Sequence, residues 1–168
     1  MPNIEIKAKY QDHDKAKSIL EKLKAKFVGT DHQIDTYFNS PQGRLKLRES
    51  SLSGAQLIPY MRPAQQGPKK SDYLVISVSD ALTCKRLFTE LFGVAVIVDK
   101  VRDIYLIENV RVHLDTVKDL GLFFEFEAVY QDPKEEESEY TKVRALLTVF
   151  GITQDNLITG SYKELINN

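Results

Sequence analysis

The sequence contains no tryptophan and a single cysteine, Cys84, among its 168 residues. One cysteine excludes an intramolecular disulfide and a zinc site built from cysteines. No apolar run approaches the ~18 residues of a membrane-spanning helix. Residues 1–7 lack the basic and apolar regions of a signal peptide. We therefore expect a cytoplasmic protein with no membrane partner.

The chain also lacks an excess of charge of one sign. Its 23 basic residues face 24 acidic ones, so the net charge is −1. This balance argues against a surface coated with basic residues for bulk nucleic-acid binding. RNA binding through basic strands would also need aromatic side chains interleaved with the lysines and arginines, and the polar strand faces carry few aromatic residues. We expect no nucleic-acid partner, and the length suits a single domain, residues 1–168.

Two periodicities predict a mixture of helices and strands. Apolar residues at helical spacing predict three helices, over 14–26, 80–92 and 135–150. The segment 62–71 contains two prolines and a glycine and is predicted to be a loop. Alternation with a period of two predicts eight or nine strands joined by short turns, over 3–10, 33–39, 44–50, 55–62, 72–79, 94–102, 103–109, 110–117 and 122–130.

One face of several predicted strands is almost wholly ionisable. In the first strand Ile4 and Ile6 share one face, and Glu5 and Lys7 share the other. A solvated outer face is the ordinary explanation of such alternation, but it usually mixes in uncharged polar residues. An antiparallel sheet of this many strands tends to curl or close. If its apolar faces point outward beneath helices, the charged faces gather in one water-filled interior.

The charges available to this interior fit a polyanion and a metal ion. The bases outnumber the carboxylates, and lysine and arginine on many strands suit several linked phosphates. The carboxylates either balance charge or bind Mg²⁺ or Mn²⁺ together with phosphate oxygens. His113 on the same face is more often a hydrogen-bonded structural residue. The basic set is Lys7, Lys9, Arg44, Lys46, Arg48, Arg62, Lys69, Lys100, Arg102 and Arg111, and the acidic set is Glu5, Asp115, Glu125 and Glu127, with Glu108, Asp35 and Glu49 at its margin.

In order and spacing these motifs resemble the CYTH domain family, the triphosphate tunnel metalloenzymes. Residues 3–7 are similar to the ExExK signature of the family, although Asn3 replaces its first glutamate. The branch that the chain most resembles is the class IV adenylyl cyclase-like one. The resemblance covers nearly the whole chain, through residues 35–38, 44–48, 60–63, 67–73, 100–102, 111–115, 124–127 and 161–165.

The resemblance implies an α+β fold, a closed eight-stranded antiparallel β-barrel whose tunnel has a charged interior and whose helices pack outside. It implies a divalent-metal-dependent enzyme acting on a small-molecule triphosphate. The reaction is either that of an adenylate cyclase, from ATP to cyclic AMP and pyrophosphate, or that of a triphosphatase on tripolyphosphate, thiamine triphosphate or a nucleoside triphosphate. A sensor that binds a triphosphate without cleaving it is the alternative, and Asn3 supports it because asparagine brings no charge. One or two metal ions, and a monomer or a homodimer, are left open.

Carried over by position, the resemblance assigns the site residues. Glu5, Lys7, Glu125 and Glu127 would be catalytic. The two cyclase candidates for contact with a base or ribose are Asp35 and Tyr37. Glu5, Glu125 and Glu127 would hold Mg²⁺ or Mn²⁺ with Asp115 as a helper, and the phosphates would be held by Lys7, Lys46, Arg48, Arg62, Lys100, Arg102 and Arg111.

Overall fold

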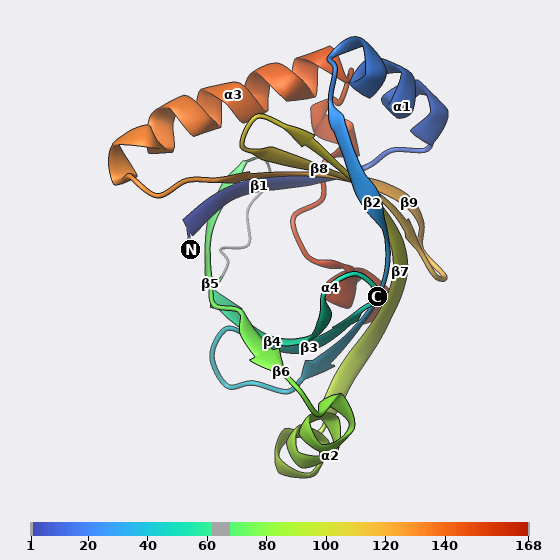
Figure 1. Cartoon of the computed structure of the whole chain (residues 1–168), viewed down its shortest axis with the longest axis vertical. Helices are drawn as coiled ribbons and strands as arrows, with labels where there is room; N and C mark the ends of the chain where they lie inside the picture. Colours follow the sequence, from blue (N-terminus) through green and yellow to red (C-terminus); the bar gives the residue numbers. More distant parts are fainter. Residues whose placement is uncertain (1, 62–67, 168) are drawn as a thin grey trace.

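The computed structural model describes residues 2–61 and 68–167, so Arg62 lies outside the described residues. In this part of the chain nine antiparallel strands form one curled sheet, and four α-helices lie around and inside it (Figure 1). The helices are α1 (His13–Lys22), α2 (Ala81–Phe92), α3 (Glu136–Val149) and α4 (Tyr162–Asn167). The strands are β1 (Pro2–Lys9), β2 (Lys26–Phe38), β3 (Arg44–Ser50), β4 (Gly54–Met61), β5 (Lys69–Tyr73), β6 (Ile76–Val78), β7 (Val94–Ile107), β8 (Val110–Val117) and β9 (Gly121–Val129).

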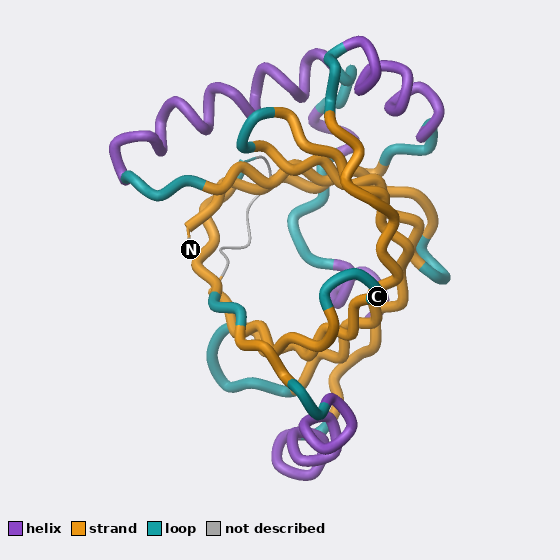
Figure 2. The backbone as a smooth tube through the Cα atoms, viewed as in Figure 1, coloured by secondary structure: helices purple, strands orange, loops and turns teal. Residues whose placement is uncertain are grey.

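The pairing of the strands curls the sheet around a central space (Figure 2). The order is β3-β2-β7-β8-β9-β1-β5-β4-β6, and β3 also pairs with β4 along its whole length. The sequence of pairings therefore returns to its starting strand, and among the described residues β4 and β5 share the pairs Tyr60–Tyr73 and Met61–Asp72. The ninth strand, β6, pairs only with β4 among the described residues and lies beyond the eight that the resemblance implies.

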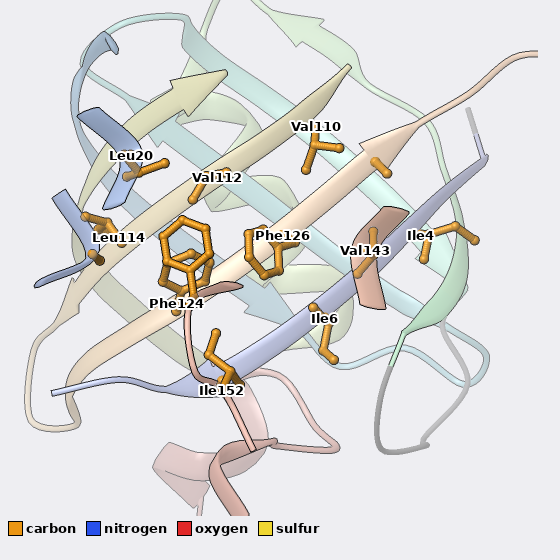
Figure 3. Packing of buried hydrophobic residues seen from close by; sticks show 14 of the residues in the cluster. Ile4, Ile6, Leu20, Val110, Val112, Leu114, Phe124, Phe126, Val143 and Ile152 are labelled. Carbon is orange, nitrogen blue, oxygen red and sulfur yellow. The ribbon is translucent and has the colours of Figure 1, made fainter. Parts of the chain in front are cut away.

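The apolar strand faces point outward and are covered by helices. Ile4 and Ile6 of β1 belong to a buried cluster with Phe124 and Phe126 of β9 (Figure 3). Leu20 of α1 and residues of α3 complete this cluster from outside the sheet. Burying such a side chain stabilises the fold by roughly 1.5–3 kcal/mol. The same alternation turns the charged residues of these strands inward, as the sequence predicts.

The C-terminal segment enters the space that the sheet surrounds. Figure 1 shows α4 inside the ring of strands. The Ile158 amide donates a hydrogen bond to the Lys7 carbonyl oxygen at 3.0 Å. Tyr162 packs in a second buried cluster with Tyr37, Val98 and Phe123. This cluster fills one part of the interior with apolar side chains, while the rest stays charged.

Several predicted element boundaries were wrong, among them the start of the strand predicted over 33–39, which is Lys26, and the end of the loop predicted over 62–71, since β5 begins at Lys69. The first helix does not run to Lys26, because Lys24 adopts a left-handed φ of 55° and the chain turns into β2. Phe27 therefore lies on β2, against Tyr105 at 5.1 Å between ring centroids. The strands predicted over 94–102 and 103–109 are one strand, β7, since no turn residue interrupts its pairing with β2 and β8. The strand predicted over 72–79 is divided between β5 and β6.

None of the described helices combines the length and apolar character that a membrane span requires.

Candidate active site

A cavity of about 750 Å³ lies within the curled sheet. Its wall includes side chains from β1, β2, β3, β4, β7, β8 and β9 and from the C-terminal segment. Because the charged strand faces point inward, bases and carboxylates from distant parts of the sequence meet here. The predicted site residues in this wall are Glu5, Lys7, Tyr37, Lys46, Arg48, Lys100, Arg102, Arg111, Glu125 and Glu127.

One side of the cavity is a cluster of cations held by a buried carboxylate. Arg48 donates two hydrogen bonds of 2.7 Å to Asp35, one to each carboxylate oxygen. Lys100 Nζ lies 2.9 Å and Lys46 Nζ 3.4 Å from Asp35 Oδ2. The strands explain this geometry, because β2 lies between β3 and β7 and pairs Asp35 directly with Arg48. Three cations thus share one fully buried anion.

This crowding shifts the pKa values of the cluster. Desolvation would raise the pKa of Asp35, but Arg48, Lys100 and Lys46 outweigh it and hold that pKa well below its usual range. Burial lowers the pKa of Lys100 to about 8, against the attraction of Asp35. Burial, followed by repulsion from Arg48, brings the pKa of Lys46 well below its usual range. The cluster is therefore short of negative charge and favours an anion.

A second buried carboxylate holds Arg102. This guanidinium donates two hydrogen bonds of 2.7 Å to Asp115, and the Tyr162 hydroxyl donates a third, of 2.6 Å, to Asp115 Oδ2. The centroid of the Tyr162 ring lies 3.9 Å from the Lys7 ammonium, close enough for a cation–π contact. Asp115 thus supports Arg102, and the structure gives no direct support to its predicted role as a metal helper.

The other side of the cavity carries the glutamates. Glu5 lies directly opposite Glu127 on neighbouring strands, and Lys7 lies opposite Glu125. Lys7 forms an ion pair with Glu125 Oε2, whereas His113 Nδ1 lies 3.1 Å and Arg102 3.5 Å from Glu125 Oε1. Desolvation would raise the pKa of Glu125, but Lys7, Arg102 and His113 keep it well below its usual range. Glu125 is therefore ionised at neutral pH.

Asn3 and His113 belong to this glutamate group. Asn3 Nδ2 donates a 2.8 Å hydrogen bond to Glu127 Oε1. Asn3 is 1% exposed, and its Oδ1 atom has no hydrogen-bond partner among the described residues. His113 is also buried, and this burial is the main cause that lowers its pKa, with Arg102 lowering it further. A neutral imidazole is the form that binds metal ions.

These donors fit a divalent cation. One ring nitrogen of His113 and one carboxylate oxygen each from Glu125 and Glu127 lie within 4.8 Å of one another. Glu5 lies opposite Glu127 and extends the row of carboxylates on this face. The Oδ1 atom of Asn3 is a further oxygen ligand of the kind that hard cations take.

Several predicted residues lie away from the cavity wall. Lys9 is exposed at the end of β1. Arg44 forms an ion pair with Glu164 of α4. Glu49 forms an ion pair with Lys85 of α2, and Glu108 lies 3.7 Å from Lys142 of α3. For Lys69 the structure describes the backbone, in β5, and not the side chain. The roles given to Lys69 and Arg62 stay predictions.

The structure also adds residues that the sequence analysis did not propose. Tyr73 lies in the wall, and burial together with Glu127 raises its pKa to about 12. Asp31 accepts hydrogen bonds from Gln33, Ser50 and Ser51, and so fixes the turn after β3 beside the cavity. Charge alternation does not mark Tyr73 or Tyr162, although both lie in stretches that the family resemblance covers, 67–73 and 161–165.

Apolar side chains form part of the same wall. Four of them, Val28, Leu52, Leu74 and Val75, are between 48% and 65% exposed. Ile104 is a less exposed member of the group. Such a group lies at the rim, where an organic part of a ligand would lose contact with water.

Comparison with known protein families assigns the chain to one of them. The model of the CYTH domain matches residues 1–162. The chain belongs to the CYTH family. A protein of Methanocaldococcus jannaschii named "Putative adenylate cyclase MJ0240" is 29% identical over 98% of both chains.

Solved structures of the same fold agree with this assignment. The PH1012 protein of Pyrococcus horikoshii is 26% identical, with a TM-score of 0.82 over 97% of this chain and 98% of that one. A Hippeastrum protein described as "Putative adenylyl cyclase HpAC1", with a dominant triphosphatase activity, is 16% identical, with a TM-score of 0.58 over 95% of this chain and 91% of that one. At that identity the second likeness shows the fold alone.

Proposed function

We propose that this CYTH protein is a divalent-metal-dependent enzyme that cleaves a small-molecule triphosphate in the cavity. One observation carries the proposal: the cation cluster around Asp35 and the glutamate group around Glu125 face the same cavity of about 750 Å³. Cations suit a chain of phosphates, and carboxylates beside them suit a metal ion that phosphate oxygens also bind. In this proposal the curled sheet acts as the closed tunnel that the family resemblance implies.

In this proposal the residues of the cavity wall have different roles. Lys46, Arg48 and Lys100 hold phosphate oxygens, since Asp35 is their shared counter-ion and leaves them short of negative charge. Cations fixed in place before the reaction stabilise the charge that grows on the departing phosphates. Lys7 holds Glu125 until an anion arrives and then contacts the phosphate chain. A bound divalent cation supplies further charge neutralisation at the reacting phosphate.

The apolar rim favours a triphosphate that carries an organic group over bare tripolyphosphate. Val28, Leu52, Leu74 and Val75 are exposed beside the charged interior. The proposed substrate is therefore a triphosphate that carries an organic group, a nucleoside triphosphate or thiamine triphosphate. A nucleoside triphosphate is cleaved either by cyclisation, as the name of the M. jannaschii relative suggests, or by hydrolysis, as the description of the Hippeastrum protein suggests. The predicted contact of Tyr37 with a base or ribose stays part of the proposal, whereas Asp35 is engaged by three cations.

A second candidate is a sensor that binds the triphosphate without turnover. The observation in its favour is Asn3, which brings no charge to the position of the first signature glutamate. Product analysis separates the candidates. ATP and tripolyphosphate are each incubated with the protein and Mg²⁺ or Mn²⁺, and the products are resolved by ion-exchange chromatography.

Cyclic AMP with pyrophosphate identifies a cyclase, and orthophosphate identifies a triphosphatase. Glu125→Gln should abolish either activity while Asp99→Asn, on the outer face of β7, leaves it intact. Tight binding of ATP with no product under any of these conditions would establish the sensor. If neither compound binds, the proposal fails.

A further inference from the structure

We infer that the cation site of this chain is a mixed nitrogen and oxygen site in which His113 is a ligand, so that it prefers Mn²⁺ or Co²⁺ to Mg²⁺. The inference rests on the proposed function in one respect, that the glutamate group binds a divalent cation. It goes further in naming the class of ion and the residue that selects it.

The position of His113 brings a nitrogen donor to the glutamates. His113 lies on β8 directly opposite Glu125 of β9, with Arg111 opposite Glu127. Its ring nitrogen and one oxygen each of Glu125 and Glu127 lie within 4.8 Å of one another. Two metal–ligand bonds of about 2.1 Å span at most about 4.2 Å. A shift of well under 1 Å therefore brings all three atoms into one coordination shell.

Asn3 supplies an independent observation. Its amide is anchored by the hydrogen bond from Nδ2 to Glu127, so its Oδ1 is held beside the same group. That oxygen is buried and has no partner among the described residues, although buried carbonyl oxygens are nearly always hydrogen-bonded. A flipped amide would place Oδ1 against the Glu127 carboxylate, which cannot donate. A cation beside Glu127 satisfies Oδ1 as the structure has it.

The donor set then decides the class of ion. Mg²⁺ prefers oxygen ligands, several of them water, in a near-ideal octahedron. Imidazole suits first-row transition ions, and affinity rises from Mn²⁺ to Co²⁺ at a given site of this type. Here Asn3 replaces a charged ligand by a neutral one, and His113 adds a nitrogen. Both differences weaken the site for Mg²⁺ more than for Mn²⁺ or Co²⁺.

Direct metal binding to the whole chain, without any triphosphate, tests the inference. Isothermal titration with MnCl₂, CoCl₂ and MgCl₂ should show Mn²⁺ binding about tenfold or more tighter than Mg²⁺. His113→Gln should weaken Mn²⁺ and Co²⁺ binding by about 10–100-fold and change Mg²⁺ binding by less than about threefold. Pulsed electron paramagnetic resonance of bound Mn²⁺ should show coupling to a nitrogen nucleus that His113→Gln removes. His32→Gln is the control, because His32 is exposed on β2 beside Asp99.

Two results would overturn the inference. Equal losses of Mn²⁺ and Mg²⁺ affinity in His113→Gln would mean that His113 only orients Glu125 by its hydrogen bond. Nitrogen coupling that is absent, or that persists in the variant, would exclude His113 as the ligand.

The outcome is also separable from that of the proposed function. If Mn²⁺ binds through His113 and no triphosphate is consumed, the inference is supported and the proposed enzymatic activity is refuted. Turnover with Mg²⁺ and no selective Mn²⁺ binding does the reverse.

Discussion

Removal of the Asp35 carboxylate should destabilise the fold and make it depend on an added anion. Asp35 is 0% exposed and is the shared counter-ion of Arg48, Lys100 and Lys46, at 2.7, 2.9 and 3.4 Å. Asp35→Asn preserves the shape of the side chain and leaves these buried cations without a counter-ion. Loss of one partner of a buried ion pair costs about 3–5 kcal/mol. A chain of this size loses about 2–4 °C per kcal/mol, so the melting temperature should fall by roughly 6–20 °C.

Thermal unfolding followed by circular dichroism measures this effect. Tripolyphosphate at 100 times the Kd of the unaltered protein should stabilise that protein by about 2.7 kcal/mol, and the same concentration should stabilise the variant more because its cations bind the anion more tightly. Asp99→Asn is the matched control, since Asp99 lies on the outer face of the sheet, where its carboxylate contacts His32. If Asp35→Asn melted within about 2 °C of the unaltered protein, less than the smallest fall expected from a lost buried partner, Asp35 would not be the counter-ion that the buried cations require.

The pH dependence of this difference follows from the pKa of Asp35. Its folded-state pKa is held well below 3.8, so the carboxylate remains charged in the native protein down to strongly acidic pH. A depressed carboxyl pKa contributes stability that is present above the unfolded-state value and is lost as the pH falls through the folded-state value. The contribution of the Asp35 charge to this difference should therefore be constant from pH 7 to about 5 and shrink only below about 4.

Two other variants test the contacts around the glutamate group. Lys7→Ala should weaken tripolyphosphate binding by about tenfold or more, since hydrogen bonds to charged groups contribute about 1.5–3 kcal/mol. The same variant should bind Mn²⁺ more tightly when tripolyphosphate is absent, because Lys7 no longer forms an ion pair with Glu125. Titration calorimetry measures both affinities. Lys9→Ala is the control, because Lys9 is exposed on the same strand. Unchanged affinities in Lys7→Ala would show that Lys7 is not part of the site. Tyr162→Phe should lower the free energy of unfolding in urea by about 1–3 kcal/mol, because Asp115 loses a buried donor. Tyr105→Phe, on the outer face, should change it by less than about 0.5 kcal/mol; equal effects would contradict the role of the Tyr162 hydroxyl.

Most of what the sequence predicted about the interior of the sheet came from the alternation of apolar and charged residues along the strands. Ile4 and Ile6 pack outward and Glu5 and Lys7 line the cavity, because side-chain direction follows a period of two whatever the neighbouring strands are. The ends of helices and strands that depend on one backbone angle could not be predicted from this alternation. The left-handed conformation of Lys24, which ends α1 early, is open to any residue at some cost and leaves no mark in the apolar pattern.

Partners across the sheet could not be predicted from alternation either. The sequence places Asp35 and Asp115 on charged faces, but their roles depend on register, which pairs Asp35 with Arg48 and Asp115 with Arg102. A shift of two residues would keep both faces and exchange every ion pair. Both carboxylates therefore look like ligands in the sequence and are counter-ions of buried cations in the fold.

The C-terminal segment shows why the site needs the whole chain. Tyr162 enters the interior from the last helix, donates to Asp115, and places its ring against the Lys7 ammonium. Asp115 in turn holds Arg102, which lies 3.5 Å from Glu125. The Lys100 ammonium of the cation cluster lies 5.6 Å from the centroid of the same ring. One side chain near the end of the sequence thus contacts both the cation cluster and the glutamate group. An aromatic ring and a single hydroxyl lie at the junction of the two groups and keep them in place with little added charge.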